Sequence, residues 1–311
     1  MRISVFRDRY LEQMRLLLRL IPYIAKEADF ALKGGTAINV FFRDLPRLSV
    51  DIDLVYLPIA DRESSLLAIT DALARVGRQL EATQSDIRAR LAAGGGNQAT
   101  RLLVSSPSAT VKVEVSPVLR GTLFPPVRMS VSKQVEEHFG FAEMQVVAFA
   151  ELFAGKIVAA LDRSHPRDLF DIQYLLAEGD FSDELFRAVL VYLVCSNRPV
   201  HELLAPREVG LDELFSDEFE GMVSMSVALG ELLETRRQLV ATLRDRTRGS
   251  AADFLVGIHD GRPDFGLLNL TQAAELPAVR WKLQNLERLK ARDPVKHARQ
   301  LEDLKQILEI S

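Results

Sequence analysis

Two aspartates separated by one residue, Asp51 and Asp53, form the clearest chemically competent group in the sequence. They lie in the run Val50–Val55, whose pattern is typical of a strand, and residues two apart on a strand point to the same face, about 6.5 Å apart. Two carboxylates at that distance repel each other by roughly 2.5 kcal/mol at an effective dielectric constant near 20. A divalent cation between them reverses the sign of this interaction, and carboxylate oxygens suit Mg²⁺ or Mn²⁺. The pair therefore predicts a metal site.

A glycine turn precedes the two aspartates, in the sequence Lys33-Gly34-Gly35-Thr36-Ala37. Glycines let backbone N–H groups approach an anion closely, and the N-terminus of a helix favours negative charge. We expect Gly34, Gly35 and Thr36 to hold the phosphates of a nucleotide that a metal ion links to the aspartates. The alternative is a tight turn beside a solvated strand face. The combination of both patterns at this spacing favours the nucleotide site.

A third acidic residue occurs in the alternating run Val111-Lys112-Val113-Glu114-Val115. If this strand lies beside the Asp51–Asp53 strand, Glu114 joins the same site as a third metal ligand. Three acids can hold two metal ions for phosphoryl or nucleotidyl transfer, with the third acid activating the attacking hydroxyl. The alternative is an ordinary surface pair of Lys112 and Glu114 on an amphipathic strand.

Charged residues also recur on two expected helices further along the chain. Lys156 and Arg163 share one helix face, and Arg167 shares another with Asp171. Taken alone, the spacing of Arg167 and Asp171 favours an exposed ion pair, and spacing cannot place Lys156 beside a phosphate.

The elements that must position these residues indicate an α/β domain followed by a helical one. Apolar periodicity predicts helices over 10–28, 36–42 and 61–81, strands over 30–32, 50–55, 102–105 and 110–115, and a loop at Gly94–Asn97. After Pro126 we expect no strand-rich stretch, and helices over 149–161, 167–177, 183–196, 228–247, 251–258, 280–289 and 302–309. The predicted fold class is an α/β domain with a mixed sheet over residues 1–130, followed by a mainly helical domain over 131–311.

Composition limits the class of protein and its compartment. The chain has 311 residues, 48% of them hydrophobic, and one cysteine, so an internal disulfide is excluded. No uncharged run approaches the roughly 20 residues of a membrane span, and we expect a cytoplasmic protein without membrane contact. The net charge of −4 hides a basic excess of five over residues 1–130, an acidic excess of twelve over 131–231 and a basic excess of three after that. The average therefore excludes no nucleic-acid partner.

These motifs together resemble the AbiEii/AbiGii-type nucleotidyltransferases, toxins of type IV toxin–antitoxin and abortive-infection systems within the DNA polymerase β-like superfamily. The resemblance rests on Lys33–Ala37, on Arg47-Leu48-Ser49-Val50-Asp51-Ile52-Asp53, on Lys112–Val115 and on Arg167-Asp168-Leu169-Phe170-Asp171. A closing segment, Leu276–Leu283 with Asn285 and Leu286, extends it over roughly residues 10–308. Within that segment Trp281 reads as a helix core anchor rather than a base-stacking residue.

The resemblance implies a function and further site residues. It implies that Asp51, Asp53 and Glu114 bind metal, that Ser49 and Asp168 join the nucleotide-binding residues, and that Lys156 contacts the triphosphate with support from Asp171. The helical domain would thereby complete the active site and bind substrate. The implied reaction transfers a nucleoside monophosphate from an NTP, with Mg²⁺ or Mn²⁺, to tRNA 3′ ends, and the implied protein partner is a cognate antitoxin. Two alternatives stay open: nucleotidylation of a small molecule or protein hydroxyl, and a nucleotide-binding module that acts only through a partner.

Overall fold

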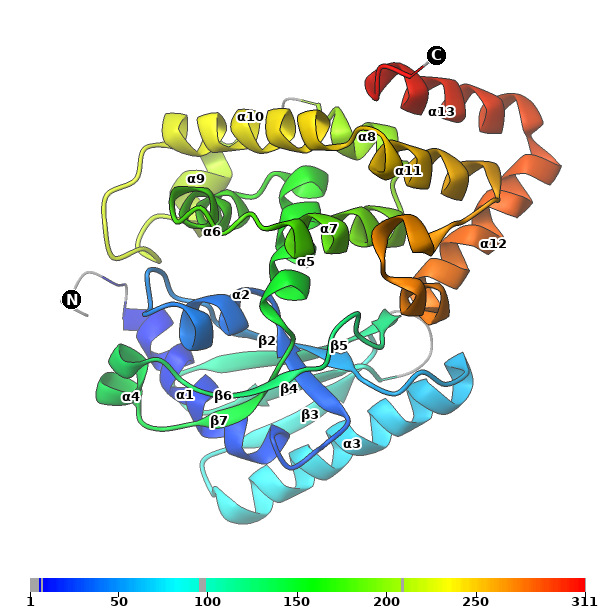
Figure 1. Ribbon diagram of the computed structural model, residues 1–311. Coiled ribbons are helices and arrows are strands. Elements are labelled where there is room, and N and C mark those ends of the chain that lie inside the picture. Colours follow the sequence, from blue (N-terminus) through cyan, green and yellow to red (C-terminus); the bar gives the residue numbers. More distant parts are fainter. Residues whose placement is uncertain (1–5, 7, 95–98, 208–209, 311) are drawn as a thin grey trace. The chain divides into compact units, whose positions relative to one another are not determined.

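The computed structural model of the chain describes residue 6 and residues 8–94, 99–207 and 210–310. It divides into two compact units. We call Met1–Ala148 with Glu218–Ser226 the N-terminal unit, and Phe149–Asp217 with Val227–Ser311 the helical unit. Figure 1 shows the elements of both units, coloured along the sequence. The predicted loop at Gly94–Asn97 falls largely outside the described residues.

A mixed sheet forms the N-terminal unit, with seven strands among the described residues in the order β3-β4-β5-β2-β1-β7-β6. The central strand β2 pairs in parallel with β5 and antiparallel with β1, while β7 pairs in parallel with β1. The strands are β1 (Phe30–Lys33), β2 (Asp51–Tyr56), β3 (Arg88–Ala92), β4 (Arg101–Ser105), β5 (Thr110–Arg120), β6 (Val127–Ser130) and β7 (Glu143–Val146). The predicted mixed-sheet class is confirmed.

Two long helices, α1 (Asp8–Ile24) and α3 (Arg62–Thr83), cover one face of this sheet. The alternation of strand residues explains which face they cover. Ile52, Leu54 and Val113 are fully buried, whereas the residues between them are only partly buried. At Gly77 of α3 an added Cβ would lie 3.3 Å from a methyl carbon of Leu102, so the helix packs closely on β4. The opposite face of β2 and β5 carries the charged side chains.

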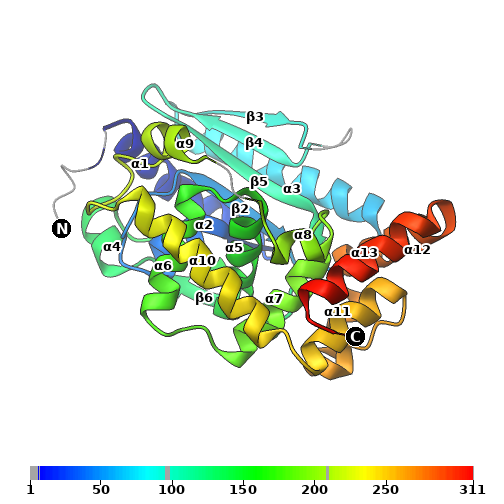
Figure 2. The same ribbon diagram turned by 90° about the horizontal axis from the view of Figure 1, so that it is seen from above.

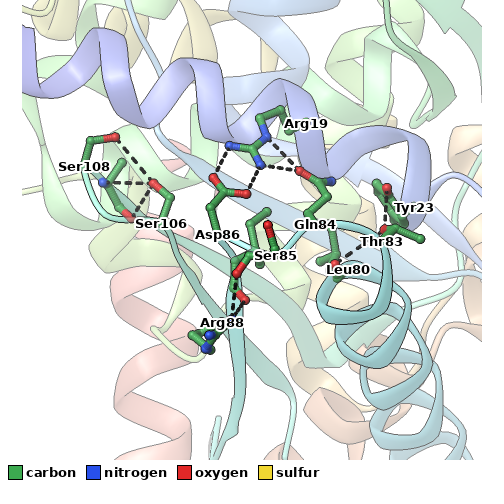
Figure 3. A network of polar contacts seen from close by, with 12 residues as sticks. Arg19, Tyr23, Leu80, Thr83, Gln84, Ser85, Asp86, Arg88, Ser106 and Ser108 are labelled. Carbon is green, nitrogen blue, oxygen red and sulfur yellow. Dashed lines mark hydrogen bonds and ion pairs between the residues drawn. The ribbon is translucent and has the colours of Figure 1, made fainter.

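Polar contacts fasten α1 to the end of α3 (Figure 3). The Arg19 guanidinium donates to both carboxylate oxygens of Asp86, at 2.9 and 2.7 Å, and to Oε1 of Gln84. Tyr23 and Thr83 share a hydroxyl hydrogen bond of 2.8 Å on the same side. These contacts fix the turn from which β3 enters the sheet.

Three strands lie outside the sequence predictions, namely β3, β6 and β7. The expectation of no strand-rich stretch after Pro126 overlooks β6 and β7, which pair with each other, and β7 joins β1. Both have four residues, and β6 is largely exposed at the sheet edge, so neither shows a long apolar run. Because these strands complete the sheet, the N-terminal unit continues to Ala148 rather than ending at residue 130.

The helical unit is built as predicted from helices, and α5 lies against α6 and α7. Its elements are α5 (Phe149–Arg163), α6 (Pro166–Ala177), α7 (Asp183–Cys195), α8 (Val200–Leu204), α9 (Asp212–Glu218), α10 (Leu229–Arg246), α11 (Ser250–Asp260), η3 (Phe265–Leu268), η4 (Thr271–Glu275), α12 (Pro277–Arg292) and α13 (Pro294–Ile307). Figure 2 shows this unit from above, with α10 as its long outer helix. No helix in the described ranges combines the length and apolar character that crossing a bilayer requires.

The short stretch Glu218–Ser226 lies between two segments of the helical unit in the sequence but belongs to the N-terminal unit. The N–H of Leu48 donates to the carbonyl of Met222 at 2.7 Å, and Ser224 donates from its N–H and its hydroxyl to the carbonyl of Pro46. This stretch therefore supports the chain just before β2.

Candidate active site

The glycine turn begins where β1 ends. Gly34 has a φ of +76°, which residues with a side chain rarely adopt. The next residues form a short helix, α2 (Gly34–Thr36), that continues as the π-helical turn η2 (Ala37–Phe42). A Cβ at Gly34 would lie 2.7 Å from Oδ2 of Asp53. The glycine thus makes room for the carboxylate, and the turn and the second aspartate are in direct contact.

Hydrogen bonds join this turn to the segment that leads into β2. The hydroxyl of Thr36 is buried, bonds to Oγ of Ser49 at 3.0 Å and donates to the carbonyl of Asp51. A Cβ at Gly35 would lie 2.9 Å from the same Ser49 oxygen and 2.7 Å from Nη2 of Arg47. The residues that sequence analysis assigned to nucleotide binding in this unit, Gly34, Gly35, Thr36 and Ser49, therefore form one connected group beside the aspartates.

The acidic residues share the polar face of the sheet. Asp51 and Asp53 alternate with buried Ile52 on β2, and on the parallel strand β5 Asp51 pairs in register with Lys112 and Asp53 with Glu114. Neighbouring strands lie about 4.8 Å apart, so the condition set by the sequence analysis, that the two strands be neighbours, is met.

The carboxylate of Glu114 is held by two cations. Arg101, its partner on β4, approaches Oε1 at 2.6 Å through Nη2 and 2.8 Å through Nε, and Lys112 Nζ lies 3.0 Å from Oε2. Burial alone would raise the pKa of Glu114, but these two partners outweigh it and hold that pKa below its usual value. The surface-pair alternative thus describes part of what is observed.

The expected three-acid metal group is not assembled in the structure. Among the residues in the described ranges, no three His, Cys, Asp or Glu side chains are grouped to hold a metal ion. Glu114 faces Arg101 and Lys112 instead. Asp51 and Asp53 alone still fit a magnesium-type ion, which proteins usually bind through one or two carboxylates together with substrate phosphates. The two aspartates thus fit one such ion, and Glu114 is not among its expected ligands.

A second charged cluster lies inside the helical unit. Lys156 on α5 reaches two carboxylates on α6, with its Nζ 2.7 Å from Oδ1 of Asp168 and 3.1 Å from Oδ2 of Asp171. Its side chain is 7% exposed and those of both aspartates 1%. Spacing alone favours an exposed position for Asp171, whereas the structure buries this aspartate against the lysine.

Arg163 completes the cluster from the last turn of α5. Its guanidinium contacts both oxygens of Asp168, at 2.6 and 3.1 Å, while remaining 60% exposed. Burial would raise the pKa of Asp168, but the positive charges of Lys156 and Arg163 outweigh it and hold that pKa well below its usual range. The buried aspartate is therefore ionised at neutral pH.

Local sequence explains how α6 delivers its two aspartates. Pro166 occupies the first turn of α6, where its missing N–H and fixed φ are favourable, and the His165 ring accepts from the N–H of Arg167 at 3.2 Å. Asp168 and Asp171 are three residues apart, so they share a helix face toward α5.

Sequence reasoning considered Lys112 as the partner of Glu114 but missed Arg101. The contact of Arg101 with Glu114 depends on β4 being the strand next to β5, which spacing in the sequence does not reveal. Residues of both clusters can bind anionic phosphates or cations, and the clusters belong to different units of the chain.

Comparisons with known proteins agree with this fold. The sequence matches the family described as "Nucleotidyl transferase AbiEii toxin, Type IV TA system" over residues 15–285. A solved structure with a similar fold is MenT4, a nucleotidyltransferase toxin from Mycobacterium tuberculosis H37Rv, with a TM-score of 0.58 and 16% identity over 91% of this chain and 94% of that one. No curated protein matches the sequence. At that identity the likeness concerns the fold alone.

Proposed function

The chain belongs to the AbiEii family of nucleotidyltransferase toxins of type IV toxin–antitoxin systems, and from this premise we propose that it transfers a nucleoside monophosphate from an NTP to the 3′ end of tRNA. The observation that carries the site assignment is the contact between the glycine turn and β2, where only the absence of a side chain at Gly34 leaves room for the Asp53 carboxylate. A phosphate group at this turn would lie beside both aspartates.

Each group in the N-terminal unit has a role in this proposal. Backbone N–H groups of Gly34, Gly35 and Thr36 bind phosphate oxygens, and Ser49 keeps the turn in place through Thr36. Asp51 and Asp53 hold a divalent cation, Mg²⁺ or Mn²⁺. When bound, that cation neutralises charge on the phosphates and polarises the group under attack.

The helical unit contributes the second set of residues. In the proposal Lys156 stabilises negative charge that develops on the triphosphate as pyrophosphate leaves. Asp168 and Asp171 act through the lysine, since their carboxylates orient its amine. These are positioning roles rather than direct contacts with substrate.

The biological partners follow from the family. A type IV toxin acts opposite a cognate antitoxin, which we propose as the protein partner, and modification of tRNA ends in the cytoplasm would block translation.

The experiment is a transfer assay with the purified chain. It contains Mg²⁺ or Mn²⁺, total tRNA and each of the four NTPs in turn, labelled at the α-phosphate. We expect label on tRNA with at least one NTP, and no label on tRNA whose terminal ribose has been oxidised with periodate. Asp53→Asn keeps the side-chain size and should reduce transfer by more than about 100-fold, since it removes a charge that holds the cation. Asp71→Asn, at an exposed carboxylate on α3, is the matched control.

Two other outcomes would replace this proposal. Label on protein or on small molecules, with tRNA unlabelled, would indicate a different hydroxyl acceptor. NTP binding without release of pyrophosphate under any condition would indicate a module that acts only through its partner.

A further inference from the structure

The side chain of Lys112 lies among three carboxylates. It pairs in register with Asp51, its amine is 3.0 Å from Glu114, and Glu114 pairs in register with Asp53. Lys112 also interacts electrostatically with Asp51 and Asp53. Its ammonium group therefore offsets part of the negative charge that the three acids bring to this face of the sheet.

Both carboxylate oxygens of Glu114 are occupied by positively charged side chains. A metal ion bound by three acids needs the oxygens of Glu114, but in this chain one oxygen faces Lys112 and the other faces Arg101. A second divalent cation at this place would meet an ammonium group, and the two positive charges would repel each other.

The two basic side chains beside Glu114, those of Arg101 and Lys112, lie in different surroundings. Arg101 lies on β4, on the side of Glu114 away from β2, because β5 separates the two strands. Lys112 instead interacts electrostatically with all three carboxylates. Arg101 therefore orients Glu114, whereas Lys112 supplies positive charge to the whole group.

We propose that Lys112 takes the place of the second metal ion, so that the site binds one divalent cation on Asp51 and Asp53 while Glu114 anchors the lysine. This inference rests on the proposed function, because it concerns the same acidic site. Lys112 is a positioning residue in this scheme, and Glu114 acts on the site through it.

The test counts bound Mn²⁺ with the metal ion alone as the probe. Electron paramagnetic resonance of free Mn²⁺ gives the number of ions bound per chain in the full-length protein. We expect one ion for the wild type and none for Asp51→Asn. Lys112→Met keeps the length of the side chain but removes its charge, and we expect it to bind two ions, the first about tenfold more tightly than the wild type does. The double variant Lys112→Met with Glu114→Gln should return to one ion.

Two variants separate charge from packing. Lys112→Arg retains the positive charge and should bind one ion. Arg101→Met removes the other partner of Glu114 but leaves the lysine, so it should also bind one ion. Circular dichroism and thermal unfolding check that every variant is folded, and a misfolded Lys112→Met would be replaced by Lys112→Gln.

Each count bears on the inference. Two ions on the wild type, or one ion on both the wild type and a folded Lys112→Met, would overturn it while leaving nucleotide transfer to tRNA intact as a proposal. No ion on the wild type at millimolar Mn²⁺ would overturn it too, and together with absent transfer activity would also remove the proposed metal-dependent function.

Discussion

At the scale of single residues, Gly34 couples backbone conformation to the position of a reactive carboxylate. An alanine there must hold a left-handed φ of +76° and bring its Cβ to 2.7 Å from Oδ2 of Asp53. We expect Gly34→Ala to lower the free energy of unfolding by about 1–2 kcal/mol and to displace the carboxylate, with a loss of nucleotide transfer of more than about tenfold.

Gly261 provides the matched control for this change, since it has a φ of +80° but nothing within 4 Å of an added Cβ. Gly261→Ala should therefore cost a similar conformational energy, measured by urea unfolding, with transfer unchanged. Equal losses of transfer in the two variants would mean that strain alone, and not the contact with Asp53, explains the effect.

The buried cluster of Lys156, Asp168 and Asp171 predicts a strong effect on stability. Lys156→Met leaves two buried carboxylates without their shared cation and should lower the free energy of unfolding at pH 7 by about 3–5 kcal/mol. Arg163→Gln removes only the exposed partner of Asp168 and should cost about 1 kcal/mol or less. Urea titration of both variants checks this order, and equal losses would contradict it.

The same cluster predicts how acid acts on the fold. The pKa of Asp168 is lowered in the folded state, so the unfolded chain binds more protons at low pH and the stabilisation by this aspartate is lost as the pH falls below about 4. Lys156→Met should weaken this dependence, because the cation that lowers the pKa is absent. Urea titrations at several pH values between 3 and 7 measure it, and an unchanged slope in the variant would assign the acid sensitivity to other carboxylates.

At the scale of elements, a pair of histidines fastens α13 to α11. The Nε2 of His259 lies 3.1 Å from the carbonyl of His297, the Nε2 of His297 lies 2.9 Å from the carbonyl of His259, and both side chains are buried with ring centroids 4.6 Å apart. Burial lowers the pKa of His259, so the unfolded chain binds more protons and stability should fall as the pH drops below about 6.5.

Thermal unfolding at pH 7.5 and 5.5 measures this effect. We expect the midpoint to fall on acidification in the wild type, and to fall less in His259→Gln. His138→Gln, at an exposed position on α4 (Lys133–Phe139), should keep the full wild-type difference. A difference of the same size in the two variants would show that the histidine pair does not carry the pH dependence.

The elements also show what the sequence can reveal. Long periodic runs such as α3, α5 and α7 are predictable because their apolar faces meet the core at helical spacing. The four-residue strands β6 and β7 have no such run, and their pairing with other strands of the sheet makes them strands.

Single side chains are also hard to place from the sequence. Trp281 is 46% exposed, so the prediction of a core anchor is wrong, and the Arg288 guanidinium lies 5.6 Å from the centre of its ring. At the site, spacing on one strand predicts that Asp51 and Asp53 share a face, whereas the pairing of Glu114 with Arg101 depends on which strand is its neighbour.

At the scale of the whole molecule, the chain contributes to the N-terminal unit twice. After the helices α5 to α8, the stretch Glu218–Ser226 belongs again to the N-terminal unit. It forms hydrogen bonds with Pro46 and Leu48, which directly precede the segment that carries Ser49 and Asp51. Phe219 and Met222 are each 1% exposed, so the stretch is anchored by buried apolar side chains as well as by backbone hydrogen bonds. The entrance to β2 is thus stabilised by residues far away in the sequence.

This arrangement predicts a local effect of a distant substitution. Phe219→Ala should lower the free energy of unfolding by about 3–5 kcal/mol, because truncating a buried aromatic ring leaves a cavity. Hydrogen exchange should increase in peptides covering residues 45–53 and stay unchanged in those covering α5 and α7, since Phe219 belongs to the N-terminal unit. Phe141→Ala, at a side chain that is 61% exposed, should change neither measurement appreciably. Faster exchange in α5 and α7 to the same extent as in residues 45–53 would mean that the stretch supports the fold as a whole, and that the acidic strand does not depend on it specifically.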